Sequence, residues 1–431
     1  MTILPSELWV LIFYWATYNP LRLSKVLDTP LPFETFDEEE VENQCRKALT
    51  VKRILSLVCS DWRFLSIQFM FEDIQVRYGS AALANILESG YKSINSRDAL
   101  GSYVHRAVFY MERNETNIDS SKNDESFGRC ARSILANCPN VRLLARRRES
   151  FAQSHALNSS LRRDENSTEY EPVNISTITR LDWVSERDDV EPGAPVATFI
   201  QGLTSLKFLS IGGTASFWTT KGNKRTANAD LYPNVQMLCI RADLRINDSI
   251  VNSEAVLHLP ALDHLVLQRP LYGEECAIFS NLEKIHTLEL GRHVAFSLTC
   301  TLEQWLDKCH NLDAVYYHVF FARPIPCNDA DHASTYPEVK VVGLHAAPNR
   351  NLQKWETWWM IAQHFAGLCS LGSRFPGLEK IELYGNEWDK LVHDTRFARI
   401  QRLVRSRHIT LVLSWPGATT VLSKTNKDDP E

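Results

Sequence analysis

The stretch PALDHLVL (residues 260–267) returns as PEVKVVGL (residues 337–344) and again as PGLEKIEL (residues 376–383). Each copy carries three apolar anchors, separated first by two residues and then by one. Alternate side chains of a strand face opposite sides, so the last two anchors point inward and the residue between them points outward. The two-residue step brings the first anchor round a turn to the same core. The pattern therefore predicts a strand that is entered through a turn.

The same unit recurs along much of the chain. Its first anchors stand at positions 178, 206, 235, 262, 285, 312, 339 and 378, with a truncated copy at residues 139–141. Six of the seven spacings lie between 23 and 29 residues, as expected of leucine-rich repeats. The seventh contains an aromatic segment, residues 355–365, for which we expect a longer helix. One unit cannot bury its own apolar face, so the series predicts a solenoid of stacked units with a parallel sheet.

The series resembles an irregular leucine-rich repeat. That family places Asn or Cys three residues after the last anchor, and only Asn386 matches here, so we expect loops of unequal length. The outward residues on the concave sheet mix aromatic, acidic and basic side chains, which suits recognition of a protein or peptide. The alternative is that they are ordinary solvated residues. The candidate substrate-binding residues are Arg180, Asp182, Phe208, Arg241, His264, Gln268, Glu289, Tyr316, His318, His345, Lys380, Glu382 and Tyr384.

Composition and charge limit the classes of function. The formal net charge of -5 and the isoelectric point near 6.2 give no general attraction to nucleic acid or anionic membranes. The ten cysteines are scattered without a C-x-x-C pair, which favours buried thiols in a reducing compartment, the cytoplasm or nucleus. A basic cluster at residues 146–148, with Arg162 and Arg163 beyond it, lacks interleaved aromatic residues, so we interpret it as the solvated flank of a loop.

The first 75 residues have a helical period. Apolar residues recur every three or four positions from Leu4 to Trp15, in a run too short to span a bilayer and without the basic start of a signal peptide. We expect a buried amphipathic helix there. Between residues 18 and 46, prolines and an acidic run predict an exposed loop. Helical period then resumes, and a short helix is expected after Ser60, a good N-cap.

This region resembles the F-box. The family's Leu-Pro-x-x-Leu start is found at residues 4–8 and its Leu-Val-Cys-x-x-Trp-Arg segment at residues 57–63, with an apolar residue, Phe71, beyond. The longer loop between the two parts is similar to that of F-box-like domains in fungal proteins that also carry leucine-rich repeats. The resemblance implies a Skp-type adaptor as partner and, through it, a cullin; the alternative is that these residues pack the module's own core. The implied adaptor-facing residues are Leu4, Pro5, Leu8, Ile12, Leu57, Val58, Cys59, Trp62 and Leu65.

No catalytic motif accompanies these modules. The sequence lacks G-x-S-x-G, H-E-x-x-H and the glycine-rich phosphate loops, and the adjacent Cys309 and His310 would point to opposite faces of a strand. We therefore expect no enzyme, cofactor or metal site.

The whole sequence predicts an α/β protein in which an N-terminal helical F-box-like module precedes an irregular leucine-rich-repeat solenoid. The expected function is that of the substrate-recognition subunit of an SCF-type ubiquitin ligase, which binds an unknown target protein but neither nucleic acid nor membrane. The alternatives are a repeat scaffold that recruits no ligase and a hydrolase with a site assembled from distant residues. The predicted domains are residues 1–75 (F-box-like, with an acidic insertion at 18–46), 76–138 (connecting region), 139–415 (repeat array) and 416–431 (polar tail).

Overall fold

The computed structural model describes residues 4–18, 32–33, 38–76, 80–89, 99–111, 133–148, 176–185, 202–213, 232–245, 257, 259–271, 275–276, 279, 282–326, 334–347, 355–370, 373–415 and 418–423. They form two compact units. The first unit holds the N-terminal helices and strands β1–β5. The second holds residues 32–33 together with the elements from β6 to β13.

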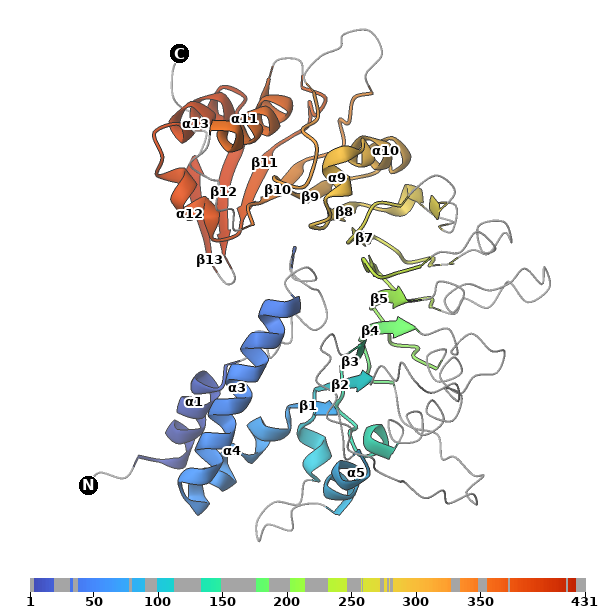
Figure 1. Cartoon of the computed structure of the whole chain (residues 1–431), viewed down its shortest axis with the longest axis vertical. Helices are drawn as coiled ribbons and strands as arrows, with labels where there is room; N and C mark the ends of the chain where they lie inside the picture. Colours follow the sequence, from blue (N-terminus) through green and yellow to red (C-terminus); the bar gives the residue numbers. More distant parts are fainter. Residues whose placement is uncertain are drawn as a thin grey trace, which may run out of the picture. The chain divides into compact units, whose positions relative to one another are not determined.

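Three helices of the first unit pack against one another (Figure 1): α1 (Ser6–Ala16), α3 (Glu38–Val58) and α4 (Ser60–Phe71). Helix α3 begins inside the stretch predicted as loop, so the acidic run supplies the first turn of a helix, where glutamate is a favoured residue type. The N-cap of α4 is Cys59 and not Ser60 as predicted. The Cys59 Sγ accepts a hydrogen bond from the Trp62 backbone N–H at 3.4 Å.

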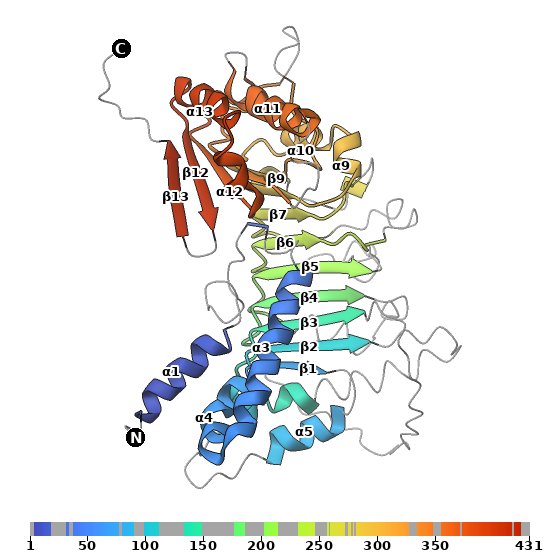
Figure 2. The same ribbon diagram turned by 60° about the vertical axis from the view of Figure 1, so that its left-hand side comes forward.

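The first unit continues with parallel strands that pair in the order of the sequence (Figure 2). They are β1 (Asp73–Val76), β2 (Arg106–Met111), β3 (Leu143–Arg148), β4 (Arg180–Ser185) and β5 (Phe208–Gly213), with helix α5 (Ser80–Ser89) and the 3-10 turn η3 (Leu100–Tyr103) after β1. The prediction that the array starts at residue 139 was wrong, because β1 and β2 already belong to the sheet. Both carry the three-anchor spacing, as Phe71-x-x-Ile74-x-Val76 and Val104-x-x-Ala107-x-Phe109, and Ile74 and Ala107 stand in register with Leu144.

The second unit repeats this arrangement. Its strands are β6 (Met237–Ile240), β7 (His264–Leu267), β8 (Thr287–Leu290), β9 (Ala314–His318), β10 (Val341–His345), β11 (Lys380–Tyr384), β12 (Thr410–Trp415) and β13 (Ala418–Ser423). They pair in parallel and in sequence order, except that β13 runs antiparallel to β12. The described start of the predicted polar tail is thus a strand.

Helices cover one face of the second unit's sheet (Figure 1). They are η7 (Leu282–Lys284), α9 (Ala295–Leu298), α10 (Thr301–Lys308), α11 (Trp355–Cys369), α12 (Glu387–Val392) and α13 (Phe397–Ser406). The rings of Phe365, Trp388 and Phe397 meet in the core beneath them. The Trp388 Nε1 donates a hydrogen bond to the carbonyl oxygen of Leu344 at 2.8 Å, which ties α12 to β10.

The predicted anchors form this core. The first anchor of each of the eight full units is buried, from Ile178 to Leu378, and so are both strand anchors of every unit. The register aligns equivalent anchors, as for Leu288, Val315 and Val342. The predicted α/β solenoid is therefore confirmed. Among the described residues, no helix combines the length and the apolar character needed to cross a membrane.

Candidate functional site

Helix α1 is apolar on two sides. On its inner side Phe13 is fully buried, and the Trp62 ring of α4 lies 4.7 Å from the ring of Trp9 and 5.0 Å from that of Phe13. Leu55 and Phe69 complete this small core. The helices therefore hold together through a stripe that differs from the one on which the F-box resemblance rests.

The outer side of α1 is uncovered, which corrects the prediction of a buried helix. Leu8 and Ile12 are exposed on it, and Leu57 at the end of α3 is 76% exposed. Of the nine implied adaptor-facing residues, those that stand exposed are Leu4, Pro5, Leu8, Ile12, Leu57, Val58 and Cys59. Trp62 and Leu65 instead pack in the bundle core. The alternative that the motif only fills the module's core thus holds for these two residues alone.

Further apolar side chains extend the exposed set beyond the implied residues. They are Leu11, Trp15, Ile54 and Phe64. Leu11 and Trp15 belong to the apolar stripe that helical spacing predicted, because they follow Leu8 by three and seven positions. We call the exposed apolar residues of α1, α3 and α4 the helical surface.

The concave residues of the first unit contact one another. The Arg180 guanidinium stacks over the Phe208 ring at 4.5 Å, and Asp182 forms an ion pair with Arg147 at 3.3 Å. All three candidate residues are buried, so they are not the ordinary solvated residues of the alternative, and they offer little exposed surface to a partner.

The basic cluster is also part of the sheet. Arg146 and Arg147 belong to β3, and Arg146 is fully buried against the Trp183 ring at 5.2 Å. The interpretation of this cluster as the solvated flank of a loop was therefore wrong. Arg162 and Arg163 lie outside the described residues.

Most concave candidates of the second unit meet around one side chain, Phe33. Its ring centroid lies 5.9 Å from that of Tyr316, 5.0 Å from His318, 4.9 Å from His345 and 5.2 Å from Tyr384. These four rings come from β9, β10 and β11, and we call them the Phe33 cage. Phe33 is 3% exposed. The repeat pattern does not predict a role for Phe33, although the apolar triplet Leu31-Pro32-Phe33 stands out from the acidic residues around it.

Two carboxylates support the cage. Glu289 of β8 is fully buried, and its Oε1 accepts a hydrogen bond from the Phe33 backbone N–H at 2.8 Å. The other Glu289 oxygen lies 3.5 Å from His264 Nε2. Glu382 accepts hydrogen bonds from the hydroxyls of Tyr384 at 2.7 Å and Tyr316 at 3.5 Å. Lys380 forms an ion pair with it at 2.6 Å.

The four side chains that form the Phe33 cage carry no charge. Burial, with the nearby charge of Glu382, raises the pKa of Tyr316 and Tyr384 above their usual range, so both hydroxyls stay protonated and can donate. Burial and the charge of Arg292 lower the pKa of His345 to about 3. Burial lowers the pKa of His318 as well, helped by His345 and Arg292. Two neutral imidazoles and two phenols thus form an aromatic lining suited to another ring.

The remaining two candidates lie apart from the cage. Arg241 follows β6 and forms an ion pair with Asp243 at 3.3 Å. The Gln268 Oε1 accepts a hydrogen bond from the Ala242 backbone N–H at 3.3 Å. Arg241 binds the turn after its own strand, whereas Gln268, which follows β7, binds the turn after the neighbouring β6. The structure gives both side chains a local role at the sheet's edge.

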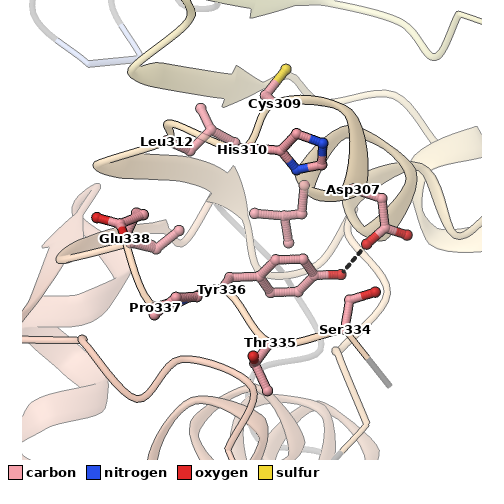
Figure 3. Close-up of a pocket in the computed structure, with 11 residues that line it drawn as sticks. Asp307, Cys309, His310, Leu312, Ser334, Thr335, Tyr336, Pro337 and Glu338 are labelled. Atoms are coloured by element: carbon pink, nitrogen blue, oxygen red, sulfur yellow. Dashed lines mark hydrogen bonds between the residues drawn. The ribbon is translucent and has the colours of Figure 1, made fainter. Parts of the chain in front are cut away.

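A separate pocket of about 360 Å³ lies between α10 and the turn before β10 (Figure 3). Tyr336 points its hydroxyl at Asp307 there and donates a hydrogen bond of 2.9 Å. Arg374 forms an ion pair with Glu303 at 3.0 Å, and its guanidinium stacks on the Tyr336 ring. Burial raises the pKa of Cys309 in the pocket wall to about 12, so its thiol is protonated and is no activated nucleophile.

No group of three or more His, Cys, Asp or Glu side chains that could hold a metal ion is found in the described ranges. No model of a known protein family matches the chain, and no curated protein matches it either.

Proposed function

We propose that this chain is the substrate-recognition subunit of an SCF-type ubiquitin ligase, active in the cytoplasm or nucleus. Its helical surface binds a Skp-type adaptor, which links it to a cullin, and its repeat array binds a target protein. The chain itself catalyses nothing and takes no cofactor. It raises the concentration of the target beside the ubiquitin-transfer enzyme.

The observation that carries this proposal is the two-sided apolar character of α1. A helix that is apolar all round belongs inside a protein, yet Leu8, Ile12 and Trp15 are exposed while Phe13 is buried. Contiguous exposed apolar surface marks interaction sites in monomeric proteins. Leu8 and Ile12 belong to the part of the F-box motif that implies adaptor contact, so an adaptor is the partner that best fits the surface.

The test is capture of the full chain by a purified Skp-type adaptor. Leu57→Arg places a charge on the helical surface without touching the bundle core, and we expect it to weaken capture about 30-fold or more, the effect of losing a hot spot of ~2 kcal/mol. Trp62→Ala is a poor probe, because Trp62 packs on Trp9 and Phe13 and its loss would loosen the helices themselves.

A matched control comes from the second unit. Leu298 of α9 is 76% exposed, as Leu57 is, so Leu298→Arg makes the same chemical change away from the helices. The control variant should be captured like the wild type. Equal capture of both variants, or no capture of the wild type, would remove the ligase assignment and leave a repeat scaffold that binds other proteins.

A further inference from the structure

Phe33 reaches the cage from a distant part of the sequence. It stands between α1 and α3, and 256 positions separate it from Glu289, the acceptor of its backbone hydrogen bond. The cage belongs to successive repeat strands in register, with His318 paired to His345 and His345 to Tyr384. The repeats thus build the cage, and a single inserted side chain fills it.

The strands are adapted to leave room for this arrangement. Gly343 is the register partner of Tyr316, and a Cβ there would lie 2.0 Å from the Tyr316 Cδ1. The Tyr316 ring therefore lies across the bare backbone of β10. Its hydroxyl points to Glu382, which the Tyr384 hydroxyl also contacts. The two tyrosines of the cage are thus held by Glu382, and Phe33 supplies neither of these hydrogen bonds.

Phe33 also has an unfavourable backbone conformation. Its φ of 67° lies in the left-handed region that residues with a Cβ seldom adopt. The burial of its ring and the hydrogen bond from its N–H group to Glu289 offset the cost of this conformation. A segment that offered the same ring and N–H group without the strain would bind better.

We propose that the Phe33 cage is a recognition site for an aromatic side chain of the target protein, and that Phe33 is its internal occupant. The ligand is an extended or turn segment with a phenylalanine-like ring whose own backbone N–H can donate to Glu289. The target displaces Phe33 on binding. This inference rests on the proposed role of the repeat array in target binding but is independent of adaptor capture by the helical surface.

The experiment measures binding in trans by fluorescence anisotropy. The probe is a labelled peptide with the sequence of residues 29–37, TPLPFETFD, and the partner is the full chain carrying Phe33→Ala, which removes the ring from the cage. We expect this variant to bind the peptide at least about tenfold more tightly than the wild type, because a tethered occupant competes at a high effective concentration. The peptide in which Phe33 is replaced by Ala should not bind.

Two further variants locate the site. Adding Tyr384→Ala to Phe33→Ala should abolish peptide binding, whereas adding Trp359→Ala, which removes an exposed aromatic side chain of α11, should leave it unchanged. Equal binding to wild type and Phe33→Ala overturns the proposal, and so does absence of binding to a folded Phe33→Ala chain. Failure of Phe33→Ala to fold also overturns it, because Phe33 would then be a core residue. Peptide binding without adaptor capture would refute only the ligase assignment.

Discussion

Replacing Gly343 with Ala should destabilise the second unit by crowding the Tyr316 ring. The added Cβ would lie 2.0 Å from the Tyr316 Cδ1 and 2.6 Å from its Cε1. Carbon atoms pack at about 3.5 to 4.0 Å, so the ring must move by roughly 1.5 Å. That movement would disturb its contacts with Phe33 and Tyr384, whose centroids lie 5.9 and 6.0 Å away.

The size of the effect follows from opposing contributions. Overpacking costs about 1 to 3 kcal/mol, and a disturbed aromatic pair adds about 0.5 to 1.5 kcal/mol. Alanine in place of glycine in a strand stabilises by about 0.5 to 1 kcal/mol, because it lowers the conformational entropy of the unfolded chain. We expect a net loss of about 1 to 3 kcal/mol, measured as a lower urea midpoint at unchanged slope.

A double-mutant cycle separates this cause from general damage to β10. When Tyr316→Ala has removed the ring, Gly343→Ala should be neutral or slightly stabilising, which gives a coupling energy of at least about 1 kcal/mol. Gly367→Ala is the matched control, because its Cβ would meet the Ile325 carbonyl oxygen, at 2.2 Å, and not the Tyr316 ring. It should destabilise equally in both backgrounds. An equal cost of Gly343→Ala with and without Tyr316 would refute the described packing.

Two further predictions concern stability. Acid should destabilise the second unit, and loss of the Phe13 ring should destabilise the helical bundle of the first unit. Because burial lowers the pKa of His345 to about 3 and that of His318 in the same direction, only the unfolded chain takes up protons just below pH 6.5. Stability is full above pH 6.5 and falls below it, by about 1.4 kcal/mol per histidine at pH 5.5; urea unfolding should show this loss, reduced in His345→Gln. Phe13→Ala should cost about 3 to 5 kcal/mol by emptying the bundle core, against less than about 0.5 kcal/mol for the exposed Leu11→Ala, in thermal unfolding of the two variants.

The repeat pattern predicted the second unit well because its information is local. Each anchor's direction follows from its place within a strand, and each strand's neighbour is the next unit along the chain. The eight first anchors and their strands accordingly lie where the spacing placed them. Strands β1 and β2 were not predicted although they carry the same anchor spacing, because their first anchors, Phe71, Val104 and then Val141, stand 33 and 37 positions apart, outside the range of leucine-rich repeats. In β2 the second anchor is also the small Ala107, where later units carry leucine, valine or isoleucine.

The same pattern could not predict what covers the outward residues. A residue such as Glu289 or His318 alternates out of the core and is nonetheless buried. Its cover, Phe33, comes from a contact far away in the sequence, which no local periodicity encodes. For the helical module the error was the reverse, since a stripe of α1 predicted to be buried is exposed. Helix α1 carries two apolar stripes, and periodicity cannot tell which of them the chain itself buries. The structure shows that the chain buries the stripe with Phe13, which packs on Trp62.

The insertion between the two parts of the F-box-like motif joins these observations. It leaves the bundle intact, since Trp9 of α1 still packs on Trp62 of α4 at 4.7 Å. It also carries Phe33, which remains tethered to both helices after it leaves the cage. On the proposed role of the cage, a target competes with an occupant that is always present. If the cage is free 1% of the time, for example, the target's apparent affinity falls about 100-fold. On this proposal, a segment that contacts the cage through its ring alone binds too weakly to displace Phe33. Binding then requires a target that makes further contacts outside the cage.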